Sequence, residues 1–373
     1  MIKIGFDAKR IFRNLSGLGN YSRSTVELLA KYHPENEYSL FTAFDENKVE
    51  FAIPKGFKVV NPTGIIADVV PSVWRSCNMA HDIRRSRIDI FHGLSNELPF
   101  DIRVGGAKSV VTMHDLIFLR YPNLYGKLDR MLYEFKYRKS CNNADMIIAI
   151  SNQTKNDLID FWNIQPERIQ VIYQGCNSLY YEKASTEVKE RVKERYNLPD
   201  QYILSVGTIE ERKNLMLTLH AIGEGNIDMP LVACGRWTPY VEKLQEYVVH
   251  KGLENKVHFI HDCSLEELPA IYQMATVSVY VSLFEGFGIP ILESMNCGTP
   301  VITSRGGVFN ETGGKAALYV GQYDLEDMIE LLKRVISDSA WREELIQNGY
   351  KHAANFTDDK IADNLMALYE KMM

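Results

Sequence analysis

Short apolar segments alternate with helical stretches along the whole chain, in two successive series. In the first half, helical stretches such as 21–31 and 128–142 separate the expected strands 3–7, 38–42, 58–60, 89–92, 108–113, 146–150 and 169–172. Strands that are joined through helices form parallel sheets with both faces covered. The alternation therefore predicts an α/β fold.

The second series follows a polar, charged stretch at 181–200. Its expected strands are 202–207, 231–234, 257–260, 277–281 and 300–304. A chain of 373 residues is long enough for two domains. We expect one domain over 1–180, a second over 181–357, and a final amphipathic segment, 358–373, that crosses back onto the first. Ligands bind beyond the carboxyl ends of parallel strands, and two such sheets facing each other form a cleft.

The composition narrows the class of protein. The net charge of −6 argues against general nucleic-acid binding. Residues 1–176 carry 23 Lys and Arg against 19 Asp and Glu, so an anionic ligand suits the first domain better. The six cysteines are scattered without a C-x-x-C pair, which predicts buried free thiols in a reducing compartment. The first seven residues suit a strand rather than a signal peptide, and no apolar run reaches the ~20 residues of a membrane span. We therefore expect a cytoplasmic protein.

The strongest functional signal is a glycine-rich loop between two carboxylates. Glu285 and Glu293 enclose Gly286, Phe287, Gly288, Ile289 and Pro290, and Gly298 follows. Pro290 suits the first turn of a helix and Gly298 its C-terminal end. The free N–H groups of such a helix start favour phosphate, and the Glu293 carboxylate can accept bonds from sugar hydroxyls. The loop predicts a pocket for a phosphorylated sugar.

Weaker polar motifs follow other expected strands. Gly207 is followed by Arg212 and Lys213, and Asn214 can cap the helix that begins after them. The helix dipole disfavours two cations at a helix start, so their presence there favours a site that holds an anion. His114 with Asp115, Arg236, and Ile260 with His261 each follow a strand. Gly17 and Gly19, after Ser16, precede a helix and resemble half of a dinucleotide fingerprint whose third glycine is replaced by Ser22. Each of these motifs alone is also compatible with an ordinary turn or surface charge.

In combination, these segments resemble the retaining glycosyltransferases of the GT-B fold, family 4, which includes mannosyl- and glucosyltransferases. The E-x7-E segment from Glu285 to Glu293 carries the resemblance, together with Gly17 and Gly19, His114-Asp115, 151–154 and 207–214. It implies two Rossmann-like domains that face each other across a cleft. The first would bind the acceptor and the second a nucleotide-sugar donor, UDP- or GDP-hexose.

The resemblance also implies roles for single residues. Arg212 and Lys213 would hold the donor diphosphate, with Gly17 and Gly19 approaching it from the other domain. Glu293 would bind the ribose hydroxyls, and Glu285 the donor sugar. The backbone of Phe287, Gly288 and Ile289 would complete the sugar site, with His114 near the reacting carbon. Gly207, Arg236, Ile260 and His261 would line the nucleotide site. His261 departs from the small residue that such proteins often carry there, and 306–311 matches the family pattern only loosely.

The chemistry expected from these residues needs no metal and no cofactor beyond the donor. The chain has no D-x-D motif, and cations and helix ends can take the diphosphate charge instead. No carboxylate stands out as a nucleophile for double displacement. We therefore expect front-face transfer with retention, in which the leaving diphosphate helps to deprotonate the acceptor.

The acceptor is less constrained. Segment 120–139 interleaves cations with aromatic residues, and a further basic cluster lies at 84–87. Such a stretch can dock on an anionic membrane surface and visit a lipid-linked glycan, or it can be a helix whose apolar side packs on the sheet. Both interpretations stay open.

Other functions compatible with the sequence are a nucleotide-sugar epimerase of the same fold and a non-catalytic partner that binds nucleotide sugars. A phosphorylase would need a lysine for pyridoxal phosphate, and none stands in a suitable context. The broken glycine fingerprint disfavours an oxidoreductase. The main prediction is hexose transfer, of mannose or glucose, in cell-surface polysaccharide synthesis.

Overall fold

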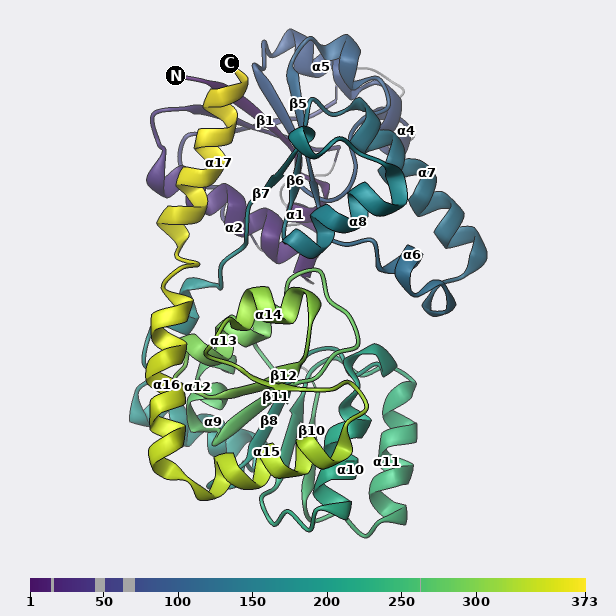
Figure 1. The fold of residues 1–373 in the computed structure, drawn as a ribbon. Helices are drawn as coiled ribbons and strands as arrows, with labels where there is room; N and C mark the ends of the chain where they lie inside the picture. The colour runs from purple at the N-terminus through teal and green to yellow at the C-terminus, as the bar shows by residue number, and fades with distance from the viewer. Residues whose placement is uncertain (15–16, 44–50, 63–70, 262) are drawn as a thin grey trace. The chain divides into compact units, whose positions relative to one another are not determined.

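The computed structural model describes residues 1–14, 17–43, 51–62, 71–261 and 263–373, and these residues form two compact units (Figure 1). The N-terminal unit comprises Met1–Gln174 together with Asp358–Met373, and the C-terminal unit comprises Gly175–Thr357. The sequence analysis predicted the border between the two domains after residue 180, a few residues later than in the structure. No described helix combines the length and the apolar character needed to cross a bilayer.

The described part of the N-terminal unit is built on a seven-stranded, all-parallel sheet in the order β3-β2-β1-β4-β5-β6-β7. Its strands are β1 Lys3–Asp7, β2 Glu37–Phe41, β3 Phe57–Val60, β4 Ile90–Gly93, β5 Lys108–Met113, β6 Met146–Ala149 and β7 Ile169–Val171. Its helices are α1 Lys9–Arg13, α2 Gly17–Tyr32, α4 Pro71–Cys77, α5 Met79–Arg85, η2 Ile102–Gly105, α6 Ile117–Arg120, η3 Pro122–Leu124, α7 Lys127–Asn143, α8 Asn152–Trp162, η4 Pro166–Arg168 and α17 Asp358–Met372.

The C-terminal unit is built on a six-stranded, all-parallel sheet in the order β10-β9-β8-β11-β12-β13, counted over its described residues. Its strands are β8 Ile203–Val206, β9 Leu231–Cys234, β10 Val257–Ile260, β11 Val277–Tyr280, β12 Val301–Ser304 and β13 Leu318–Val320. Its helices are η5 Ser178–Tyr181, α9 Thr186–Tyr196, η6 Glu211–Lys213, α10 Leu215–Glu224, α11 Tyr240–His250, α12 Leu268–Met274, α13 Ile289–Asn296, α14 Gly307–Gly313, α15 Leu325–Ser337 and α16 Ser339–Ala353.

The strands form where short apolar runs are buried on both faces. In β5, for example, every residue after Lys108 is buried, as a parallel sheet covered by helices requires. The α/β prediction is therefore confirmed. Among the elements that the sequence analysis missed, β13 is a three-residue edge strand that is only partly buried, and α9 lies inside the polar, charged stretch 181–200. Helix α9 begins where the Ser185 hydroxyl accepts a bond from the Val188 N–H, and Val192 is its buried residue.

The final helix belongs to the N-terminal unit, where α17 packs against α2. A buried polar chain anchors it: the Tyr369 hydroxyl lies 2.7 Å from Nδ1 of His92, and His92 Nε2 lies 2.7 Å from the Thr112 hydroxyl. Tyr21 of α2 reaches the same Thr112 hydroxyl at 3.1 Å. Burial, together with nearby His114, lowers the pKa of His92 to about 3, so the ring is neutral at physiological pH.

Because these groups are buried, we expect Tyr369→Phe to lower the free energy of unfolding of the N-terminal unit by about 1–3 kcal/mol. The phenyl ring keeps the packing but leaves Nδ1 of His92 without its hydroxyl partner. Urea unfolding followed by tryptophan fluorescence measures the loss. Tyr323→Phe is the matched control, since Tyr323 is 79% exposed. Equal unfolding midpoints for the two variants would contradict the anchoring role of Tyr369.

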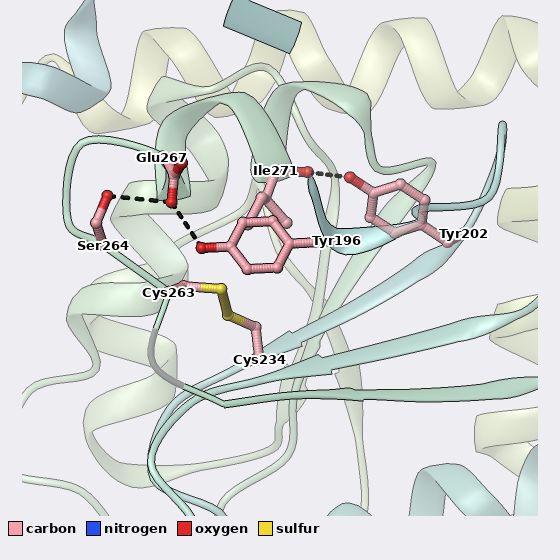
Figure 2. The surroundings of a disulfide bond; sticks show 7 residues. All are labelled: Tyr196, Tyr202, Cys234, Cys263, Ser264, Glu267 and Ile271. Atoms are coloured by element: carbon pink, nitrogen blue, oxygen red, sulfur yellow. Dashed lines mark hydrogen bonds between the residues drawn. A yellow bond between two sulfur atoms is a disulfide. The ribbon is translucent and has the colours of Figure 1, made fainter. Parts of the chain in front are cut away.

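The expectation of buried free thiols is wrong at three cysteines. Figure 2 shows a disulfide between Cys234, the last residue of β9, and Cys263, which follows β10. Strands β9 and β10 are parallel neighbours, so the segments beyond their carboxyl ends lie side by side. The two cysteines are 29 positions apart in the sequence, which gives no sign of this proximity. Cys77 is free but exposed, whereas Cys141, Cys176 and Cys297 are free and buried. Beside the disulfide, the Glu267 carboxylate accepts bonds from Tyr196 at 2.6 Å and Ser264 at 3.2 Å (Figure 2).

Candidate functional site

The C-terminal sheet has a topological switch point between β8 and β11. The chain adds β9 and β10 on one side of β8, then places β11 on the other side and continues outward to β13. Helices that leave neighbouring strands in opposite directions open a crevice at such a point, where open α/β sheets bind ligands. A small pocket lies here, lined by Gly207, Thr208, Lys213 and Tyr280 among other residues.

Two cations and one carboxylate converge at the switch point. The Glu285 Oε1 atom lies 2.7 Å from Nη1 of Arg212 and 2.7 Å from Nζ of Lys213. Lys213 also donates to the Tyr280 hydroxyl at 3.0 Å, and Arg212 donates to the Phe284 carbonyl at 2.6 Å. Glu285 follows β11 and the cations follow β8, so the sheet order joins residues that are about 70 positions apart. We call Arg212, Lys213 and Glu285 the charge cluster.

The charge cluster is largely buried, with side-chain exposures of 18%, 18% and 12% for Arg212, Lys213 and Glu285. Burial alone would raise the pKa of Glu285, but Lys213 and Arg212 overcome it and lower that pKa to about 2. The pKa of Arg212 is raised by Glu285 and Glu210 against the opposing effect of burial. The Glu285 carboxylate and the Arg212 guanidinium are therefore ionised at neutral pH, in a site that is largely shielded from solvent.

Glu293 lies on α13 of the same unit, next to the side chains of Tyr180 and Tyr272. Its Oε2 atom accepts a bond from the Tyr272 hydroxyl at 3.0 Å. The Tyr180 hydroxyl is buried near the same carboxyl and makes no hydrogen bond of standard geometry to any described residue. The rings of Tyr180 and Tyr272 meet edge to face, 5.9 Å apart. Burial raises the pKa of Glu293 to about 7 despite Tyr272 and Tyr180. Glu293 is thus a carboxyl group kept in a poorly solvated place, as functional carboxyls often are.

Backbone conformation requires the glycines after β8 and β9, and at Gly235 a close approach of two backbones adds to this requirement. Gly207 and Gly235 have φ values of 138° and 154°, and a Cβ on Gly235 would lie 2.0 Å from the Gly207 carbonyl oxygen. Both positions therefore require glycine. The sequence singled out Gly207, but the need for Gly235 becomes visible only when β8 and β9 pair.

The turn into α13 has the predicted features. Gly288 adopts φ 99° at the helix start, Ile289 is the first helical residue and Pro290 the second. Gly298, with φ 72°, ends the helix, which confirms the predicted cap. The Phe287 side chain is buried, and its carbonyl accepts a bond from the Thr312 hydroxyl at 2.6 Å. The Phe287 side chain therefore belongs to the core, and the role of the backbone here in sugar binding stays a prediction.

Three predicted residues lie beside the charge cluster rather than within it, at the ends of β9 and β10. Arg236 has an exposed side chain, and its carbonyl accepts a bond from the Ile209 N–H at 2.9 Å. Ile260 is buried, and its carbonyl accepts from Gly235 at 3.0 Å. His261 is exposed, and its ring meets that of Trp237 edge to face at 5.2 Å. A Trp237 side chain that is 40% exposed offers a flat surface to a base.

In the N-terminal unit, His114 follows β5 as predicted. It is 6% exposed, and its Nε2 atom lies 2.9 Å from the Leu94 carbonyl, so the ring donates there. Burial lowers the pKa of His114 to about 4, which leaves the ring neutral at physiological pH. The Tyr21 ring packs edge-on against it at 4.7 Å. Asp115 accepts a bond from the Ile117 N–H at 3.1 Å at the start of α6.

Two local expectations are wrong. Gly17 and Gly19 lie inside α2, which begins at Gly17, rather than in a loop before it; Ser16 lies outside the described residues. A Cβ on Gly19 would lie 1.6 Å from the Asn14 carbonyl oxygen. Position 19 therefore requires glycine because α2 packs closely against the preceding backbone. Asn214 does not cap α10 with its side chain; it adopts φ 56° and donates to the Gln322 carbonyl at 2.8 Å.

Sequence reasoning missed Tyr180, Tyr272, Tyr280 and Trp237. Tyr280 is the last residue of β11, so position at a carboxyl strand end could have identified it. Tyr180 and Tyr272 lie in η5 and α12, where they look like ordinary core aromatics until α13 places Glu293 between them. Trp237 could have been identified by its place two residues after Gly235, just beyond the end of β9.

Two family models match the chain in succession. Residues 16–178 match a model described as Glycosyltransferase Family 4, and residues 187–352 match one described as Glycosyl transferases group 1. Among similar curated proteins, O-antigen chain mannosyltransferase B of Escherichia coli is 27% identical over 99% of this chain and 100% of that protein. O-antigen chain mannosyltransferase RfbU of Salmonella typhimurium is 30% identical over 60% of each chain.

Solved structures agree on the fold. The HepE protein of Anabaena, solved in complex with UDP and glucose, superposes with a TM-score of 0.76 at 16% identity over 100% of both chains. WaaG, a glycosyltransferase involved in lipopolysaccharide biosynthesis, gives a TM-score of 0.70 at 16% identity over 98% of both chains. With two parallel-sheet units and two matching family models, the chain belongs to the family 4 glycosyltransferases of the GT-B fold.

Proposed function

We propose that this enzyme transfers a hexose, mannose or glucose, from a nucleotide diphosphate sugar to a glycan or lipid-linked glycan in cell-surface polysaccharide synthesis. The charge cluster at the β8/β11 switch point carries the proposal. Its two cations stand where a ligand of an open α/β sheet binds. Relatives named as O-antigen mannosyltransferases support the acceptor class, and a neighbour solved with UDP and glucose supports the donor class.

The charge cluster suits a leaving diphosphate. In the structure Glu285 takes one bond from each cation, and Lys213 gives a second to Tyr280, so the ammonium keeps one N–H to donate. When the bond between the anomeric carbon and the donor phosphate breaks, its electron pair stays on the phosphate oxygen. Fixed cations that are already desolvated stabilise the charge at that moment. In the proposed mechanism this oxygen takes the acceptor's hydroxyl proton as the new glycosidic bond forms on the same face.

Glu293 suits the ribose. Its carboxyl group can accept hydroxyl bonds, and Tyr272 holds one of its oxygens in place. The buried Tyr180 hydroxyl lies near the same carboxyl and is a second candidate to bind a ribose oxygen. The role of His114 at the reacting carbon stays a prediction. A metal-independent reaction is part of the proposal, since the cations supply the charge that Mg²⁺ supplies elsewhere.

Two measurements test the proposal. Release of free nucleotide from GDP-mannose, UDP-glucose and related donors should depend on a glycan acceptor and continue in EDTA. An isomerised donor would indicate an epimerase instead, and binding without release a non-catalytic protein. NMR of the product should show the anomeric configuration of the donor. Inversion would contradict front-face transfer while leaving the donor site in place.

A further inference from the structure

The turn that follows β13 bonds to both loops that carry the charge cluster. The side-chain amide of Gln322 donates from Nε2 to the Leu283 carbonyl oxygen at 2.6 Å. The backbone carbonyl of Gln322 accepts a bond from Nδ2 of Asn214 at 2.8 Å. Leu283 stands just before Glu285 in the loop after β11, and Asn214 directly follows Lys213 in the loop after β8. Gln322 therefore connects the two loops.

Strand pairing alone does not fix the positions of these loops. Strand β8 ends at Val206 and β11 ends at Tyr280, so the charge cluster lies beyond the paired part of both strands. Past these ends, the Leu283 N–H donates to the Arg212 carbonyl at 2.8 Å. The N–H of Leu283 is thus bonded to the loop after β8, and its carbonyl to the turn after β13. Both polar groups of one backbone position depend on segments that are distant in sequence.

The local structure of Asn214 suits this connection. Its φ of 56° lies in the left-handed region, which asparagine adopts more readily than most residues other than glycine. Its side chain does not cap α10 and bonds to the β13 turn instead. Asn214, Gln322 and Leu283 are all partly buried, so water competes less for their polar groups than it does on an open surface.

We propose that Gln322 is a positioning residue for sugar transfer, which holds the two cations and the carboxylate of the charge cluster in place before the donor binds. Charges that are already in place stabilise a leaving diphosphate without having to move in the transition state. A displacement of about 1 Å in such a site can cost about 100-fold in rate. The role in transfer rests on the proposed function, whereas the connection between the loops does not.

The two bonds of Gln322 act in series. One joins the loop after β8 to the β13 turn, and the other joins the β13 turn to the loop after β11. Loss of either bond interrupts the connection, so loss of the second should add little to the effect on the rate. Two contacts that acted independently would instead give effects that multiply in the double variant.

Steady-state transfer by the full chain tests the positioning role. Gln322→Met keeps the length of the side chain and removes its N–H donor, whereas Asn214→Gly keeps the left-handed backbone and removes the other bond. Each variant should lower kcat by about tenfold or more and change the donor KM by less than about threefold, because the diphosphate gains charge only in the transition state. The double variant should lose about as much as the worse single variant.

Hydrogen exchange without donor or acceptor gives a second measurement that does not depend on turnover. The Leu283 amide should exchange at least about tenfold faster in Gln322→Met, because its loop opens more often, while the amides of β11 stay as protected as in the wild type. Gln347→Met is the matched control. The Gln347 side chain is exposed on α16 and donates to Glu343, so its loss should change neither kcat nor the exchange of Leu283.

Unchanged kcat in Gln322→Met would overturn the positioning role, and so would a loss in the double variant equal to the product of the two single losses. Faster exchange in every part of the C-terminal unit would indicate general destabilisation and would overturn it as well. If the wild type transfers no hexose to any acceptor but Gln322→Met still speeds the exchange of Leu283, the proposed function fails and the connection between the loops stands.

Discussion

Replacing Arg212 and Lys213 together with alanine should lower kcat/KM for hexose transfer by about a thousandfold or more. Removal of one preorganised donor from a developing anion typically costs about 100- to 1,000-fold, and this variant removes two cations. Both groups are less than one-fifth exposed, so water cannot replace them efficiently. Steady-state transfer measured at saturating acceptor gives the ratio.

The variant needs a control for folding, because it leaves Glu285 in a poorly solvated place without its partners. Burial would then dominate, and the pKa of Glu285 would rise from its present value of about 2. A triple variant with Glu285→Gln removes that charge and should be equally inactive yet fold well. Lys256→Ala, at a surface pair with Asp228, is the matched loss of a cation and should keep turnover. Turnover within a few-fold of wild type in the double variant would refute the role of the charge cluster, as would loss of wild-type activity in EDTA.

Glu293→Gln should change activity and stability in opposite directions. The amide oxygen can still accept from Tyr272, but the neutral group binds ribose hydroxyls less strongly than a carboxylate does. We expect kcat/KM to fall by about 100-fold at pH 8, about 2.7 kcal/mol. The same substitution should raise the free energy of unfolding of the C-terminal unit by about 2 kcal/mol at pH 8, because it removes a carboxylate that burial disfavours.

The stability gain should depend on pH with a definite sign. The pKa of Glu293 is about 7 in the folded state, above the value of 4.5 of an unperturbed glutamic acid. Below pH 4.5 both states hold the proton, so wild type and variant should be equally stable. As pH rises to 7, the unfolded state loses its proton first, and the wild type loses stability relative to the variant. Thermal melts at pH 4.5 and pH 8 measure the difference; a gain of equal size at both pH values would contradict the assignment.

The fold could be predicted because the information for a parallel sheet is local. In β5 and β9, a few consecutive apolar residues are each buried on both faces, so the strands are visible in the sequence without knowledge of their neighbours. The E-x7-E loop could be predicted for the same reason, since Gly288 and Pro290 determine a helix start within a few positions. Strand β13 was not predictable, because a strand of three residues, two of them only partly buried, gives almost no pattern.

The electrostatics of the site could not be predicted from local patterns. Arg212 and Lys213 were found, but their neutralisation by Glu285 depends on β8 and β11 being neighbours. The pKa of Glu293 is raised by burial, and this burial comes from residues outside α13, among them Tyr180 and Tyr272. The exposure of Leu128, Met131 and Phe135 on α7 is likewise a tertiary fact, because a helix with two apolar sides does not reveal which side the protein covers.

The return of α17 to the first sheet affects how this protein can be made. The N-terminal unit needs a helix that follows the C-terminal unit in the chain, with Tyr369 reaching His92 across 277 positions. A ribosome must therefore finish the whole C-terminal unit before the first sheet can acquire its last helix. Until then the nascent N-terminal unit leaves the α17 side of its core uncovered, and transiently exposed apolar surface of this kind favours aggregation. A gene that joins codon 174 directly to codon 358 would remove that delay.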